Sequence, residues 1–230
     1  MKFVFLIVLL LTFLTMYVTS RTLNVSIVAR VEVNTPTGIK MGSSLMKFTY
    51  KRPSFPGFFP SYLNNVRRGL QGEAIAVEVS PGRYLFALLG EGGYYTEPDA
   101  WLGAVFYPPV ISVNRDAGYK RWIGELKRTK TAFPVPERAY PPFVVFSDMN
   151  DFTSIQVLEP DDIAAFFGSG TSIKSLTIET TSGAPVFGKV EKLLPWLTTE
   201  VVTRLCPPTY QTTGPHCGSI SHGDFLMRDF

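Results

Sequence analysis

The sequence predicts a mainly β protein of the α+β class. We expect antiparallel hairpins that form a sandwich or an open barrel, a few short helices, and one hydrophobic helix at the N-terminus. Aromatic residues favour strands, and the 230-residue chain has 18 Phe and 10 Tyr. Turns are favoured by its 18 Pro and 19 Gly. Several segments also alternate apolar and polar residues, which is typical of strands with one solvated face.

The first twenty residues predict export. Lys2 is followed by an apolar run over 3–18 and by Thr19 and Ser20, as in a secretory signal. A membrane-spanning helix needs about 20 residues, with a lower limit of about 17. The run therefore predicts either a signal peptide cleaved after Ser20 or, slightly favoured, an anchor that crosses the membrane through residues 3–19. A buried helix is the weaker alternative, because the run has no polar face.

The rest of the chain is long enough for one large domain. We assign residues 1–20 to the signal peptide or signal anchor, 21–205 to a β-rich exported domain, and 206–230 to a loop-rich tail. A domain of this size buries a core without metals, and we expect no cofactor and no metal site. The formal net charge of +3 gives no electrostatic argument for nucleic acid as a partner.

Residues 22–33 (TLNVSIVARVEV) alternate with a period of two, and residues 39–50 repeat the pattern. The turn residues 35–38 (TPTG) lie between them. The two segments therefore predict a long hairpin.

Residues 52–65 (RPSFPGFFPSYLNN) predict a loop, because the three prolines exclude a regular helix or a central strand. We name Phe55, Phe58 and Phe59 as a candidate contact patch for a membrane surface or a partner protein. In the commoner alternative, the loop folds over a sheet and buries these rings.

A second hairpin is predicted from residues 71–79 and 83–89, joined by the turn residues 80–82 (SPG). The segment 83–89 (RYLFALL) is apolar on both faces, which predicts a central strand. Glu73 and Glu78 then fall on opposite faces of one strand, so they do not form a pair for acid–base catalysis.

The pattern of residues 114–130 predicts a helix with bases on one side, which we interpret as a solvated face. Residues 143–146 predict a short buried strand, and residues 147–151 a turn.

The C-terminal half predicts strands at 155–158 and 172–180. Between them, Pro160 begins a short helix at 161–167 that ends at Gly168. Residues 190–197 predict a short helix or turn broken by Pro195.

Cys206 and Cys217 are the two cysteines of the chain. An exported protein meets an oxidising compartment, and an even count at short spacing predicts one disulfide. The loop-entropy argument gives such a bridge a stabilisation of roughly 3 kcal/mol. A pair of free thiols is the main alternative.

The tail also holds the two histidines, His216 and His222. A metal site that combines them with the cysteines is a weaker alternative, because the spacing matches no known zinc pattern. Ser221 and Asp224 lie beside His222, but such neighbours in a flexible tail arise more often by chance than for catalysis. We therefore assign no catalytic residue.

Five short motifs resemble a pattern found in uncharacterised bacterial envelope proteins. They are residues 31–38 (VEVNTPTG), 42–44 (GSS), 72–77 (GEAIAV), 82–89 (GRYLFALL) and 194–197 (LPWL). The resemblance implies one N-terminal hydrophobic segment and a β-rich exported domain, with no known activity. It implies a location in the bacterial inner membrane facing the periplasm, or in the periplasm or outside the cell if the chain is cleaved.

These observations favour a non-enzymatic binding or scaffold module of the envelope, with an envelope protein as its partner. The alternatives are an exported hydrolase that acts on a cell-wall or surface polymer, and a carrier of an apolar ligand. A hydrolase predicts converging polar side chains, an adaptor predicts a flat apolar patch, and a carrier predicts a closed apolar cavity.

Overall fold

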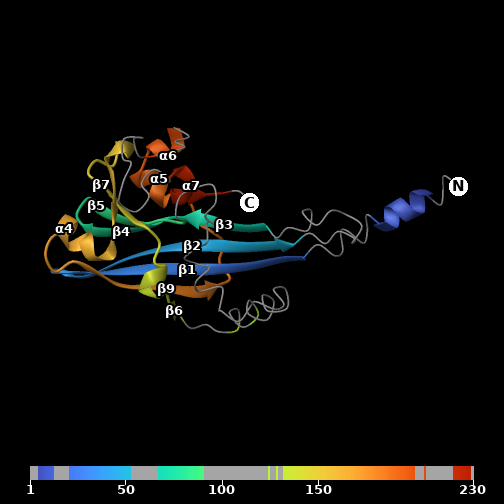
Figure 1. The fold of residues 1–230 in the computed structure, drawn as a ribbon, viewed down its shortest axis with the longest axis horizontal. Coiled ribbons are helices and arrows are strands. Elements are labelled where there is room, and N and C mark those ends of the chain that lie inside the picture. Colours follow the sequence, from blue (N-terminus) through green and yellow to red (C-terminus); the bar gives the residue numbers. More distant parts are fainter. Residues whose placement is uncertain are drawn as a thin grey trace.

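The computed structural model of the chain describes residues 5–12, 21–52, 67–90, 124, 128, 132–199, 205 and 220–228. Within these residues the protein is mainly β, with two antiparallel sheets and a few short helices (Figure 1). Strands of the larger sheet follow the order β10-β3-β2-β1-β9-β6, and strands of the smaller sheet the order β4-β5-β7-β8.

The strands of the larger sheet are β1 (Arg21–Thr35), β2 (Gly38–Arg52), β3 (Arg67–Glu73), β6 (Phe133–Pro134), β9 (Ser172–Thr181) and β10 (Leu226–Met227). Those of the smaller sheet are β4 (Ile75–Ser80), β5 (Arg83–Ala87), β7 (Phe143–Phe146) and β8 (Ile155–Leu158). The short helices are η2 (Glu137–Ala139), η3 (Phe152–Ser154), η4 (Pro160–Asp162), α4 (Ile163–Phe167), α5 (Lys189–Leu193), α6 (Trp196–Thr199) and α7 (His222–Phe225).

The long hairpin of β1 and β2 is confirmed, with Arg21 opposite Arg52 and Thr35 opposite Gly38. Gly38 has a φ of 116°, a conformation that side chains other than glycine's rarely adopt. The Thr35 hydroxyl donates a hydrogen bond to the Gly38 carbonyl at 2.6 Å and helps to hold the turn. Alternate residues of β1 point inward and are buried, as a strand with one solvated face requires.

The predicted strand 71–79 is wrong as a single element. Residues up to Glu73 belong to β3 in the larger sheet, and Ile75 begins β4 in the smaller one. Ala74 lies at the crossing, and its N–H bonds the Phe225 carbonyl at 2.8 Å. Glu73 and Glu78 therefore lie on different strands, and only Glu73 is buried. The β4–β5 hairpin is confirmed, and β5 is central.

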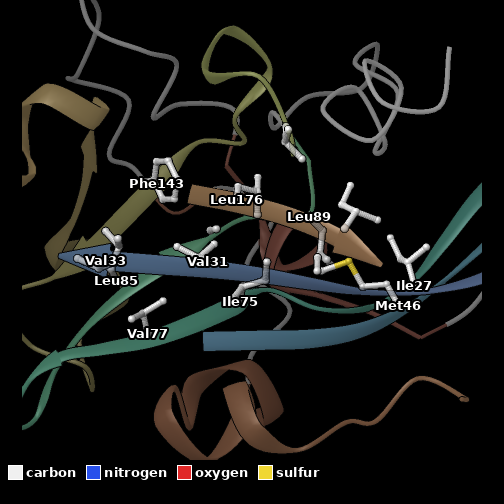
Figure 2. Packing of buried hydrophobic residues seen from close by; sticks show 14 of the residues in the cluster. Ile27, Val31, Val33, Met46, Ile75, Val77, Leu85, Leu89, Phe143 and Leu176 are labelled. Atoms are coloured by element: carbon white, nitrogen blue, oxygen red, sulfur yellow. The ribbon is translucent and has the colours of Figure 1, made fainter. Parts of the chain in front are cut away.

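The two sheets enclose the larger hydrophobic core, in which side chains of β1, β4, β5, β7 and β9 meet (Figure 2). Gly42 of β2 allows a close approach between the sheets. A Cβ at this position would overlap the carbonyl oxygen of Ala76 on β4 and lie 2.8 Å from a methyl group of Val77. A glycine is needed here because the backbone itself fills the space that a side chain would take.

A second core lies on the other face of the smaller sheet, where α5, α6 and α7 cover it (Figure 1). The rings of Phe86, Phe146, Trp196 and Phe225 contact one another there, with centroids 5.8–6.1 Å apart. The smaller sheet is thus buried on both faces. This explains why β7 is apolar and buried along its whole length, without alternation.

The remaining predicted elements in the described part agree with the structure in kind. The strands predicted at 143–146, 155–158 and 172–180 appear as β7, β8 and β9. The helix predicted after Pro160 begins as η4, continues as α4, and ends at Gly168, whose φ is 107°. The helix predicted at 190–197 is interrupted at Pro195, which separates α5 from α6.

Residues 5–12 are helical, and the apolar side chains from Phe5 to Leu11 are exposed. In the part of the chain that the structure describes, no helix combines the length and the hydropathy needed to cross a membrane. The loop predicted at 52–65 lies, apart from Arg52, outside the described residues. Of the helix predicted at 114–130 only Gly124 and Arg128 are described, and both are helical.

Candidate functional site

A pocket of about 370 Å³ lies at one end of the smaller sheet, where β7 begins and β8 ends. This volume is near the lower end of the range for small-molecule sites, about 300–1,000 Å³. Its lining comes from η2, the segment after it, the first residue of β7, the end of β8, the start of η4, and Ile220. The lining residues are Glu137, Arg138, Tyr140, Pro141, Pro142, Phe143, Val157, Leu158, Glu159, Pro160 and Ile220.

The pocket lies at the edge of the sheet rather than over one face. Leu158 packs against the core between the two sheets, whereas its neighbour Val157 packs against the core beneath the helices. Successive residues of a strand point to opposite faces, so a pocket lined by both must reach around the strand. Among the described residues β8 pairs with β7 alone, which makes β8 the edge strand.

Prolines and backbone hydrogen bonds hold the walls of the pocket. The Pro142 carbonyl accepts the Leu88 N–H at 3.1 Å, which ties this wall to the end of β5. On the other side, the Glu159 carbonyl accepts the Asp162 N–H at 2.9 Å and closes the first turn of η4. Because proline fixes φ, Pro141, Pro142 and Pro160 stiffen both walls.

The rim of the pocket is charged. Glu137, Arg138 and Glu159 are exposed, so their charges are available to a ligand. The half-buried Tyr140 lies deeper, with its ring edge-on to Phe143 at a centroid distance of 6.0 Å. Burial, and then the negative charge of Glu137, raise the pKa of the Tyr140 hydroxyl above its usual value. The hydroxyl is therefore neutral at physiological pH and can both donate and accept a hydrogen bond.

This arrangement can bind and orient a ligand that has an apolar body and a charged or polar group. Phe143 and Ile220 form a buried floor, while the rim supplies two carboxylates and one guanidinium.

The described lining residues hold no serine, cysteine, histidine or lysine that could act as a nucleophile. In the described part of the chain, no three of the His, Cys, Asp and Glu side chains come close enough together to hold a metal ion.

The site residues named from the sequence lie outside the described residues. This holds for the contact patch of Phe55, Phe58 and Phe59 and for the cysteine pair Cys206 and Cys217.

The tail residues weighed for catalysis have structural roles where they are described. Asp224 accepts hydrogen bonds from the Ser221 N–H at 2.8 Å and the Ser221 hydroxyl at 3.0 Å, which makes a capping box for α7. The His222 ring nitrogen Nε2 lies 2.8 Å from the Leu197 carbonyl oxygen on α6. The serine thus bonds the aspartate rather than the histidine, which does not match the relay of a catalytic triad.

The sequence also contained no indication of a buried polar contact made by Glu73. Glu73 has an exposed fraction of 3%, and its carboxylate accepts the backbone N–H groups of Gly188, Lys189 and Val190 at the start of α5. A carboxylate at this position satisfies donors that a helix cannot pair within itself. Its role is therefore to join the sheets to the helical layer.

Comparison with protein-family models, with curated proteins and with solved structures finds no match for this chain.

Proposed function

We propose that the protein is a non-enzymatic binding module of the bacterial envelope and that the pocket at the β7–β8 end of the smaller sheet is its ligand site. The supporting observation is the composition of this pocket. Stiff, apolar walls give affinity through burial, at about 25 cal/mol per Å² of apolar surface. The rim of Glu137, Arg138 and Glu159 gives selectivity through charge.

The proposed location depends on the N-terminal segment. Phe5, Leu6 and Leu10 have exposed fractions of 70%, 61% and 69%, which in water is unfavourable and in a membrane is favourable. The first strand begins at Arg21, directly after the proposed cleavage site. We therefore propose a hydrophobic N-terminal helix that either anchors the β-sandwich in the inner membrane, facing the periplasm, or is removed during export.

The proposed disulfide between Cys206 and Cys217 gains support from the residues that flank this segment. The Leu205 N–H bonds the Ile220 carbonyl at 3.0 Å, and both side chains are buried. This hydrogen bond holds together the two residues that flank the segment with the cysteines. A disulfide between Cys206 and Cys217 therefore joins positions whose neighbours already lie close to each other.

Phe55, Phe58 and Phe59 stay a second proposed contact region. Replacing all three residues with alanine in a membrane pull-down tests this proposal.

Site-specific photo-crosslinking in intact cells tests the proposed ligand site. A benzophenone amino acid replaces Glu159 on the rim in one strain, and Glu179 on the outer face of β9 in the control strain. Both positions carry a carboxylate in the natural sequence, and Glu179 lies in the other sheet. We expect a specific adduct at position 159 that is missing at position 179.

The chemical nature of the adduct separates the proposed function from its alternatives. A protein adduct supports a binding or scaffold module, a lipid adduct a carrier, and a polysaccharide or peptidoglycan adduct a protein that acts on a surface polymer. Equal labelling at positions 159 and 179, or no labelling at either position, contradicts the assignment of the pocket as a ligand site.

A further inference from the structure

The free edge of β8 is the feature of this pocket that points to a class of ligand. An edge strand presents unpaired backbone N–H and C=O groups along one side. In the described part of the chain β8 has β7 on one side and no strand on the other. Gln156 in this strand is exposed, and Val157 and Leu158 are half-buried.

The pocket and the edge form one continuous surface. Val157 lies toward one face of the sheet and Leu158 toward the other, yet both line the same pocket. A ligand that contacts both side chains must run along or around the edge of β8. An extended peptide does this naturally, because its alternate side chains point to the two faces of the sheet it joins.

The charge of this surface selects among peptides. The rim has the carboxylates of Glu137 and Glu159 and one guanidinium, that of Arg138. Two further carboxylates, Asp161 and Asp162, are exposed in η4 directly after Pro160. Taken together, these four described carboxylates and one guanidinium carry a net negative charge, which attracts lysine and arginine and repels acidic residues.

We propose that the protein binds an extended basic segment of a partner protein, which adds as a strand to the edge of β8 and places an apolar side chain in the pocket. This inference rests on the proposed function and names its ligand class. Backbone hydrogen bonds along β8 give affinity, the pocket selects an apolar residue, and lysine or arginine at neighbouring positions pairs with Glu137 and Glu159.

Three synthetic peptides test this inference against the purified full-length protein. The first is an eight-residue peptide that alternates valine and lysine, with both ends blocked. The second carries glutamate in place of every lysine. The third has the sequence of the first, but N-methyl groups replace the backbone N–H hydrogens on one side. Fluorescence anisotropy gives the affinity, and amide chemical shifts in NMR spectra identify the residues that are perturbed.

We expect the lysine peptide to bind with perturbations at β8 and η2, and the glutamate peptide to bind at least about tenfold more weakly. The N-methylated peptide should lose binding, because it cannot pair with a strand edge. The double variant Glu137→Gln/Glu159→Gln should weaken the lysine peptide about fivefold, while Glu179→Gln leaves its affinity unchanged. Equal binding of all three peptides, or binding of none, overturns the inference.

The outcome also separates this inference from the proposed function. If no peptide binds but the photo-crosslink at position 159 persists in cells, the pocket is a ligand site for another chemical class. If peptides bind with perturbations elsewhere, on the outer face of β9 for example, the edge of β8 is not the docking surface.

Discussion

The carboxylate of Glu73 accepts the backbone N–H of Val190 at 3.2 Å, across 117 positions of sequence. Glu73 is the last residue of β3, directly before the chain passes from one sheet to the other, and Val190 lies in the first turn of α5. This contact joins three layers at one point. We therefore expect the attachment of α5 to the sheets to depend on this buried carboxylate.

Replacing Glu73 with alanine should lower the free energy of unfolding by roughly 3 kcal/mol, because the N–H groups of Gly188, Lys189 and Val190 lose their acceptor in a buried place. Urea unfolding of the chain from Arg21 measures this change. Glu78→Ala is the matched control, since Glu78 is exposed and its carboxylate accepts the Gly82 N–H at the surface. Equal losses in the two variants would contradict the structural role of Glu73.

Phe225, in α7, belongs to the core beneath the helices. Phe225 is fully buried, and its carbonyl accepts the Ala74 N–H where the chain crosses between sheets. Phe225→Ala should therefore destabilise the protein by about 3–5 kcal/mol. Thermal unfolding measures this loss, and Met227→Ala is the control. Met227 lies two positions further on and is half-buried, so its replacement should destabilise the protein less. A Phe225→Ala variant as stable as the natural protein would show that this segment does not dock.

The pKa of the Tyr140 hydroxyl reports the negative charge of Glu137 on the rim of the pocket. Because the charge of Glu137 raises the pKa of the Tyr140 hydroxyl, Glu137→Gln should lower that pKa toward its usual value, as followed by NMR of the tyrosine ring. A raised pKa in the folded state means that the unfolded state loses this proton first. Stability should accordingly fall as the pH rises above about 10, and less steeply in Glu137→Gln. An unchanged Tyr140 pKa in this variant places Glu137 away from the hydroxyl.

The proposed disulfide predicts a difference in mass between protein alkylated without reductant and protein alkylated after reduction. If Cys206 and Cys217 are bridged, alkylation without reductant leaves the protein unlabelled, and alkylation after reduction adds two groups. The bridge should stabilise the fold by roughly 3 kcal/mol, so reduction should also lower the unfolding temperature. Labelling of both thiols without reductant would refute the bridge.

Elements with a strict local pattern could be predicted from the sequence. The alternation of Val25, Ile27 and Val31 identified β1, because one face of that strand is buried and the other is solvated. The break at Ala74 was missed because the chain changes sheets without a proline or a turn sequence. Residues 72–77 are all buried, so no change in the apolar pattern marks the boundary between β3 and β4.

The candidate site could not be predicted, because it is made by segments that are distant in the sequence. Tyr140, Leu158 and Ile220 meet only after the two sheets pack. The available signal was the position of Pro141 and Pro142 before β7 and of Pro160, between Glu159 and Asp161, after β8. Similarly, the sequence placed Glu73 on a strand, but only tertiary packing brings the start of α5 to its carboxylate.

The claim that the β7–β8 pocket binds a ligand is tested most directly by the photo-crosslink at position 159 in a chain that also carries Leu158→Asn. Leu158 is half-buried in the pocket wall, so a polar side chain there should lower the ligand's affinity while the fold, checked by circular dichroism, persists. We predict that the adduct is lost in this variant and retained when Asn replaces Val186, an exposed residue away from the pocket. An adduct of unchanged yield in the Leu158→Asn chain would contradict the assignment of this pocket as the binding site.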